Sequence, residues 1–207
     1  RLAARLTALG HRVIAVDLRG HAASARTADY ALDAIRDDVL GLLDILDLRH
    51  VVLVGHSVGG YAALAAARHA PDRVARLVLE DIAAPPRRLP SWHAGPLRLL
   101  TAAVRRRPQS AVGINAAIVL QLVRPDPVWW DRLREVRQPT LVVSGGRASY
   151  LPPRRLAEVA AALPDARFAT IPVGHRVHSL APDAFAAEVE AFLPAVVSVQ
   201  DGSGAAV

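Results

Sequence analysis

The segment that most limits how this chain can fold is Gly55-His56-Ser57-Val58-Gly59-Gly60. It directly follows the apolar run at residues 51–54 and directly precedes the alanine-rich, helix-forming stretch at residues 61–69. A continuous apolar run closed by glycine is typical of a strand buried on both faces, so the segment predicts a tight strand-to-helix turn. Glycines on both sides of Ser57 fit such a turn, because a Cβ there would clash with the neighbouring strand and helix.

The serine of this turn is placed for nucleophilic chemistry. A G-x-S-x-G motif between a strand and a helix is a nucleophile elbow, in which a strained turn exposes the hydroxyl of Ser57 above the sheet. The helix that follows directs its first amides to the same place, so we expect the N–H of Val58 to stabilise the negative charge that develops in acyl transfer. The alternative is a glycine-rich turn with an idle serine, since the bare motif is common by chance.

The rest of the chain alternates between short apolar runs and amphipathic stretches. We expect further strands at residues 13–16, 77–79, 141–143 and 168–171. We expect further helices at residues 2–9, 31–48, 153–163 and 182–192. Strands that alternate with helices indicate an α/β fold with a mostly parallel sheet and helices on both faces. Sites in such sheets lie at the carboxyl ends of the strands.

Between Ile82 and Gln138 the strand pattern disappears, and prolines separate short helical pieces. We interpret this stretch (about residues 82–138) as a helical cap insertion within one domain that spans residues 1–193. It contains all three tryptophans of the chain, Trp92, Trp129 and Trp130. Because aromatic side chains often line ligand pockets, we expect them to bind substrate, and packing of the cap on the sheet is an equally good explanation for any one of them. We expect residues 194–207, with their Gln-Asp-Gly-Ser-Gly stretch, to be disordered.

The composition excludes several kinds of chemistry. Of the 207 residues 52% are hydrophobic, which is enough for a buried core, but no apolar run is long enough to cross a membrane. The chain has no cysteine and no lysine, so it has no disulfides, catalytic thiolate or Schiff-base lysine. Its formal charge of +6 comes from arginines that are scattered, apart from Arg105–Arg107. With only 4% aromatic residues as well, we expect neither nucleic acid nor a membrane as a partner.

A serine nucleophile needs a general base, and the chain has eight histidines. His175 follows Gly174 and the last expected strand, which puts it at the carboxyl edge of the sheet. There an imidazole nitrogen can approach the Ser57 hydroxyl within about 2.6–3.2 Å, or more loosely without ligand, and take its proton. His178 is the alternative base. His56 lies inside the elbow, where we expect it to point beneath the turn and to have a packing role.

With these features the chain resembles the α/β-hydrolase superfamily, from Arg1 to about Leu193. The loop Asp17-Leu18-Arg19-Gly20-His21-Ala22-Ala23-Ser24 is similar to the family's loop after an early strand, with Ala22 where the family usually has glycine. The resemblance implies hydrolysis of esters, amides, lactones or related bonds through an acyl-serine intermediate, with a small-molecule substrate and without cofactor or metal. A serine at the elbow argues against epoxide hydrolases and dehalogenases, which have aspartate there.

The position of the acid departs from the family pattern. Family members usually have it in the loop after the penultimate strand, where this chain has Ser149. Some relatives have it after the preceding strand, and Asp81 lies there. We therefore expect Asp81 to be the charged partner of His175, with Glu80 pointing the opposite way by strand alternation. The alternative role of Asp81 is to cap or brace the insertion, and a missing acid would favour a non-catalytic protein that binds a small molecule or a protein partner.

The second departure is at the start of the sequence. The family's opening strands, whose His-Gly loop supplies half of the oxyanion hole, have no counterpart here, and loss of one donor typically costs about 100- to 1,000-fold in rate. In the sheet of the family, these opening strands lie between the strands that correspond to residues 13–16 and 51–54. We therefore expect an N-terminally truncated chain with a gap inside its sheet. The sequence starts without Met or a signal-type stretch, and we expect a cytoplasmic protein. We predict a serine hydrolase for a small, largely apolar ester-like substrate.

Overall fold

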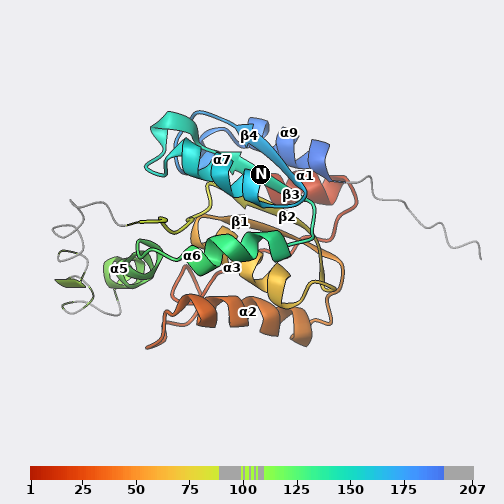
Figure 1. Ribbon diagram of the computed structural model, residues 1–207. Helices are drawn as coiled ribbons and strands as arrows, with labels where there is room; N and C mark the ends of the chain where they lie inside the picture. Colours follow the sequence, from red (N-terminus) through yellow and green to blue (C-terminus); the bar gives the residue numbers. More distant parts are fainter. Residues whose placement is uncertain (89–98, 100, 103, 105, 107–109, 194–207) are drawn as a thin grey trace, which may run out of the picture.

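The computed structural model describes residues 1–88, 99, 101, 102, 104, 106 and 110–193 of the chain. Its sheet has four parallel strands in the order β1-β2-β3-β4 (Figure 1). Their bounds are Val51–His56 for β1, Val74–Glu80 for β2, Thr140–Ser144 for β3 and Ala166–Thr170 for β4. Because all four strands run in the same direction, their carboxyl ends meet along one edge of the sheet, where the sequence predicts the site.

Helices cover both faces of this sheet. They are α1 (Leu2–Ala8), α3 (Val58–His69), α7 (Pro153–Ala162) and α9 (Pro182–Phe192). Leu77 and Leu79 of β2 pack with side chains of α3 and α7. Val78, between them, packs on the other face with side chains of α1 and α9, which lie next to each other (Figure 1). The predicted α/β fold, with strands buried on both faces, is confirmed.

The prediction of a strand at residues 13–16 is wrong. These residues belong to no helix or strand, and Val13, Ile14 and Val16 are between 36% and 51% exposed. A strand forms only through hydrogen bonds to a neighbouring strand, and within the described part of the chain β1 pairs with β2 alone. The apolar β-forming sequence is therefore present at residues 13–16, but it has no partner there.

Helix α2 (Leu32–Ile45) packs on the outer side of α3, where Ile35 joins the same apolar cluster as Ala62. The stretch between β2 and β3 contains α5 (Ala111–Leu122), α6 (Pro127–Asp131) and the 3-10 helix η2 (Arg132–Glu135), and its described residues form no strand. The remaining elements are η3 (Gly146–Ala148) and α8 (Val177–Leu180). No helix within the described ranges is long and apolar enough to cross a membrane. The expected disorder of residues 194–207 falls outside the described residues.

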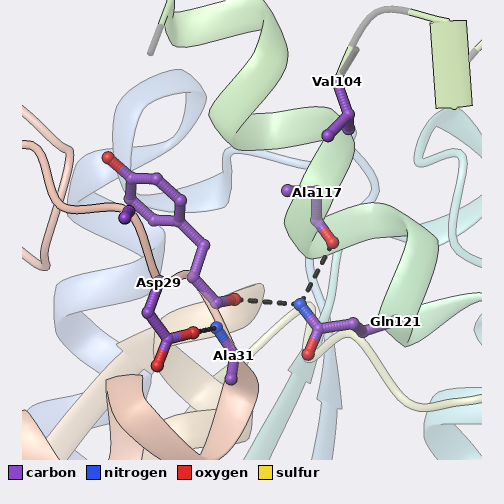
Figure 2. A pocket seen from close by; sticks show the side chains of 7 residues that line it. Asp29, Ala31, Val104, Ala117 and Gln121 are labelled. Atoms are coloured by element: carbon purple, nitrogen blue, oxygen red, sulfur yellow. Dashed lines mark hydrogen bonds between the residues drawn. The ribbon is translucent and has the colours of Figure 1, made fainter. Parts of the chain in front are cut away.

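One side chain joins the insertion to the start of α2. The Nε2 group of Gln121, in α5, donates to the carbonyl oxygen of Tyr30 at 2.9 Å (Figure 2). Its Oε1 accepts from the backbone N–H of Leu32 at 3.1 Å. This N–H belongs to the first turn of α2, where the helix itself supplies no acceptor. The insertion is thus attached to the main fold by polar contacts as well as by apolar packing.

Candidate active site

Ser57 lies at the junction of β1 and α3 in an unusual backbone conformation. Its φ is 53° and its ψ is −114°, a combination that residues other than glycine rarely adopt. The backbone N–H of Ser57 donates to the carbonyl oxygen of Glu80 at 2.9 Å, which ties the turn to the end of β2. The N–H of Val58 belongs to the first turn of α3 and has no acceptor within that helix. The turn is therefore strained, and it lies at the carboxyl edge of the sheet.

The glycines of the motif differ in how much space they have. A Cβ on Gly55 would lie 2.4 Å from the carbonyl carbon of Gly59, so only glycine fits there. A Cβ on Gly60 would lie 3.0 Å from the carbonyl oxygen of Gly55, which is tight. At Gly59 the nearest atom is Cδ1 of Leu18 at 3.9 Å, an ordinary contact. The steric explanation is therefore right for Gly55, before the serine, and wrong for Gly59, the second glycine of the G-x-S-x-G motif.

This difference predicts opposite effects for two alanine substitutions. Gly55→Ala forces backbone atoms apart, and we expect it to lower the free energy of unfolding by about 1–3 kcal/mol or more. Gly59→Ala adds a methyl group in the first turn of α3 and removes a flexible residue from a helix, so we expect a gain of about 0.5–1 kcal/mol. Urea denaturation of the two variants would measure both changes. An equal loss in both would contradict the steric argument.

Asp81 receives three hydrogen bonds in a fully buried position. Its Oδ1 accepts from the backbone N–H of Gly145 at 2.9 Å. Its Oδ2 accepts from the hydroxyl of Ser149 at 2.5 Å and faces Nδ1 of His175 at 2.7 Å. Ser149, at the position where the resemblance predicts the family's acid, therefore donates a hydrogen bond to Asp81, which we expect to be the acid instead. Asp81, Ser149 and His175 come together although each follows a different strand.

His175 directs one ring nitrogen toward a buried carboxylate, as the histidine of a serine triad does. Because its Nδ1 faces a carboxylate, the neutral form of the ring has its proton on Nδ1 and its lone pair on Nε2. Gly174 precedes it with φ 101°, and its N–H donates to the carbonyl oxygen of Gly145 at 2.9 Å. The described residues include no hydrogen bond between the His175 ring and the Ser57 hydroxyl, so their close approach stays a prediction.

Tyr150 was not found by sequence reasoning, although it is adjacent to Ser149. Its ring centroid lies 4.1 Å from that of His175. Partial desolvation raises the pKa of the Tyr150 phenol, and a hydrogen bond with the Ser57 hydroxyl opposes this shift. The residue is nevertheless 74% exposed, so it lies over the histidine at the surface of the site. No feature of the sequence distinguishes it from any other loop tyrosine.

The alternative base, His178, binds a different carboxylate. Its backbone N–H donates to Oε1 of Glu80 at 2.9 Å, and its Nδ1 lies 2.8 Å from Oε2. Glu80 is buried, while the His178 side chain is 42% exposed. Two histidine–carboxylate pairs thus join the end of β2 to the segment after β4. They are Asp81 with His175 and Glu80 with His178.

The described tryptophans are packed in the core. Trp129 and Trp130 are each 4% exposed, within the apolar cluster that also contains Leu77 and Leu79. The indole N–H of Trp130 donates to the carbonyl oxygen of Pro85 at 2.9 Å. These contacts fit the packing explanation, and substrate contact by either residue stays a prediction. Trp92 lies outside the described residues.

Two cavities in the described part of the chain lie away from the elbow. One of about 330 Å³ lies between the loop before α2 and helix α5, where Asp29, Val104 and Gln121 are among its lining residues (Figure 2). The other, of about 320 Å³, is lined by residues that include Tyr61 and Trp129. Neither has Ser57 or His175 in its lining, so neither identifies a substrate pocket.

Comparison with known proteins agrees with this geometry. The family model for the alpha/beta hydrolase fold matches residues 1–114. The chain is 32% identical to the sn-1-specific diacylglycerol lipase ABHD11 of Mus musculus, over 89% of the chain and 72% of that protein. It is 28% identical to the esterase YbfF of Escherichia coli (strain K12), over 88% of the chain and 83% of the relative. By name, both of these relatives are hydrolases.

Solved structures lead to the same family. A thermophilic esterase from Thermogutta terrifontis matches with a TM-score of 0.64 and 29% identity, over 84% of this chain and 76% of that one. A bromoperoxidase from Bacillus anthracis matches with a TM-score of 0.77 over 92% of this chain and 84% of that one, and at 18% identity it shows the fold alone. With its strand-to-helix serine turn, its parallel sheet and these matches, the chain belongs to the α/β-hydrolase fold family.

Proposed function

We propose that this chain is a serine hydrolase that cleaves small, largely apolar ester-like substrates through an acyl-serine intermediate. The observation that carries the proposal is the 2.7 Å contact between Nδ1 of His175 and Oδ2 of Asp81, at the edge of the sheet where Ser57 lies on its strained turn. A buried carboxylate that holds Nδ1–H leaves Nε2 to accept a proton. In this proposal Ser57 is the nucleophile, His175 the base and Asp81 the acid.

The chemistry runs in two halves. In the first, Oγ of Ser57 attacks the ester carbonyl carbon while Nε2 of His175 takes the hydroxyl proton. The same nitrogen then returns the proton to the leaving alcohol as its bond to the carbonyl carbon breaks. In the second, a water molecule attacks the acyl-serine with the same proton transfers, which releases the acid and restores Ser57. Asp81 stays ionised throughout, and the N–H of Val58 donates to the oxyanion.

The preference for apolar esters rests on what surrounds the elbow. Ile114 and Ile118 of α5 belong to an apolar cluster against which Leu18 and Val58 pack. Val58 directly follows Ser57, so the insertion brings apolar side chains close to the nucleophile. In this proposal the insertion acts as a cap over the substrate. The names of the mouse lipase and the two esterases support an ester bond as the target.

Hydrolysis of p-nitrophenyl acetate, butyrate and octanoate tests the proposal. We expect turnover of all three, with a higher kcat/KM for the longer acyl chains because they bury more apolar surface. A fluorophosphonate probe is expected to stop turnover, and mass spectrometry is expected to find its adduct on the peptide that contains Ser57. Absence of both turnover and adduct would favour the non-catalytic binding protein, and an adduct elsewhere would reject Ser57 as nucleophile.

A further inference from the structure

We propose that His56 is a positioning residue for His175, and that the Glu80–His178 pair assists it by holding the same loop. The inference rests on the proposed function, in which His175 is the general base. The sequence favoured a packing role for His56 beneath the elbow. The structure gives it a specific polar partner instead, and that partner is the backbone of the base itself.

The contact that carries this inference joins Nε2 of His56 to the carbonyl oxygen of His175 at 2.8 Å. A carbonyl oxygen only accepts, so the His56 proton lies on Nε2 and is donated to it. The two imidazole rings also pack together, with centroids 4.4 Å apart at an angle of 53°. The His56 ring also meets that of His178, with centroids 5.1 Å apart. His56 thus contacts both histidines of the last loop.

The protonation state of His56 suits a fixed donor. Burial lowers its pKa and the neighbouring histidines His175 and His178 lower it further, while the charge of Glu80 and the hydrogen bond to the His175 carbonyl oppose them. The ring is therefore neutral near pH 7 and has a single N–H, which is committed to the His175 carbonyl. A neutral ring also adds no positive charge that would disfavour protonation of His175 during the reaction.

Together these contacts hold the segment after β4, which contains His175 and His178, at two points. His56, at the end of β1, binds the backbone of His175, and Glu80, at the end of β2, binds the backbone N–H of His178 at 2.9 Å. The carbonyl oxygen of Glu80 also accepts from the N–H of Ser57 at 2.9 Å. The ends of β1 and β2 therefore hold both the turn that contains Ser57 and the loop that contains His175. A misplacement of about 1 Å in such an arrangement can cost on the order of 100-fold in rate.

Two substitutions at position 56 separate positioning from packing. Glutamine can place an amide N–H close to where Nε2 of the imidazole lies, so we expect His56→Gln to retain kcat within a few-fold. His56→Leu fills the same space without a donor, and we expect kcat to fall by about 10- to 100-fold with KM nearly unchanged. His69→Leu, at the exposed far end of α3, is the matched control and should behave as the unaltered protein. Melting temperatures show whether each variant folds.

A second measurement does not depend on turnover. The proton that His175 shares with Asp81 should give a far-downfield NMR resonance, which we expect to persist in His56→Gln and to broaden by exchange with water in His56→Leu. If both variants keep kcat and the resonance, or both lose them equally while folded, the positioning role is overturned. If the unaltered protein turns over no ester, the proposed function fails, and the resonance still decides whether His56 orders the His175 loop.

Discussion

Replacement of Ser57 by alanine is expected to reduce ester turnover to the background rate, a loss of at least about 10,000-fold in kcat. The hydroxyl oxygen forms the covalent bond to the acyl group in the proposed mechanism, and no neighbouring side chain can substitute for it at the same strained position. Alanine has to adopt the same φ of 53°, so the strain of the turn is unchanged. We therefore expect the fold to survive and KM for any residual activity to stay similar.

The control for this prediction is Ser179→Ala, which removes an exposed serine hydroxyl from α8. Steady-state kinetics with p-nitrophenyl butyrate and labelling with the fluorophosphonate probe should both distinguish the two variants. Labelling is expected to vanish in Ser57→Ala and to be complete in Ser179→Ala. Persistent labelling or turnover in Ser57→Ala would show that another residue is the nucleophile.

The sequence predicted the sheet because its strands are marked by local patterns. The apolar runs at residues 51–54, 77–79, 141–143 and 168–171 all lie within or overlap observed strands. The run at residues 13–16 has the same composition and is no strand, because strand formation depends on a partner and not on propensity. Local patterns therefore reveal which segments can be strands, and the pairing decides which of them are.

The loop near the start of the chain gives an example of a family pattern with a physical cause. Ala22 has φ 40°, in the left-handed region that glycine adopts at little cost. This explains why the resemblance leads one to expect glycine there. The departure at position 22 thus concerns backbone strain in the loop and none of the proposed catalytic groups.

The site was predictable in part, because its residues follow strand ends. Ser57 and Asp81 directly follow β1 and β2, His175 lies in the loop after β4, and parallel strands bring their carboxyl ends together. The contacts of His56 and Tyr150 with His175 join positions far apart in the sequence, and no local pattern encodes them. The role of Ser149 as a donor to Asp81 also depends on this long-range geometry.

Asp81→Asn is expected to lower kcat by about 10,000-fold, as loss of the orienting carboxylate does in a serine triad. The carboxylate accepts three hydrogen bonds, from Gly145, Ser149 and His175, and an amide keeps only one accepting oxygen. If its NH₂ group faces His175, the ring must carry its proton on Nε2, which removes the lone pair that the mechanism needs. Ser149→Ala removes one donor and keeps the carboxylate, so we expect a loss of only a few-fold.

A double variant tests whether the carboxylate itself is what matters. The Ser149 hydroxyl reaches the same Oδ2 of Asp81 that faces His175, so a carboxylate attached at position 149 comes close to Nδ1 of His175. We expect Asp81→Asn with Ser149→Asp to recover at least about 10-fold of the kcat lost in Asp81→Asn alone, since each 1.36 kcal/mol of barrier is tenfold in rate. The control Asp81→Asn with Ser149→Asn adds similar volume without charge and should recover nothing. Equal activity in the two double variants would mean that Asp81 braces the loop without stabilising the charged His175.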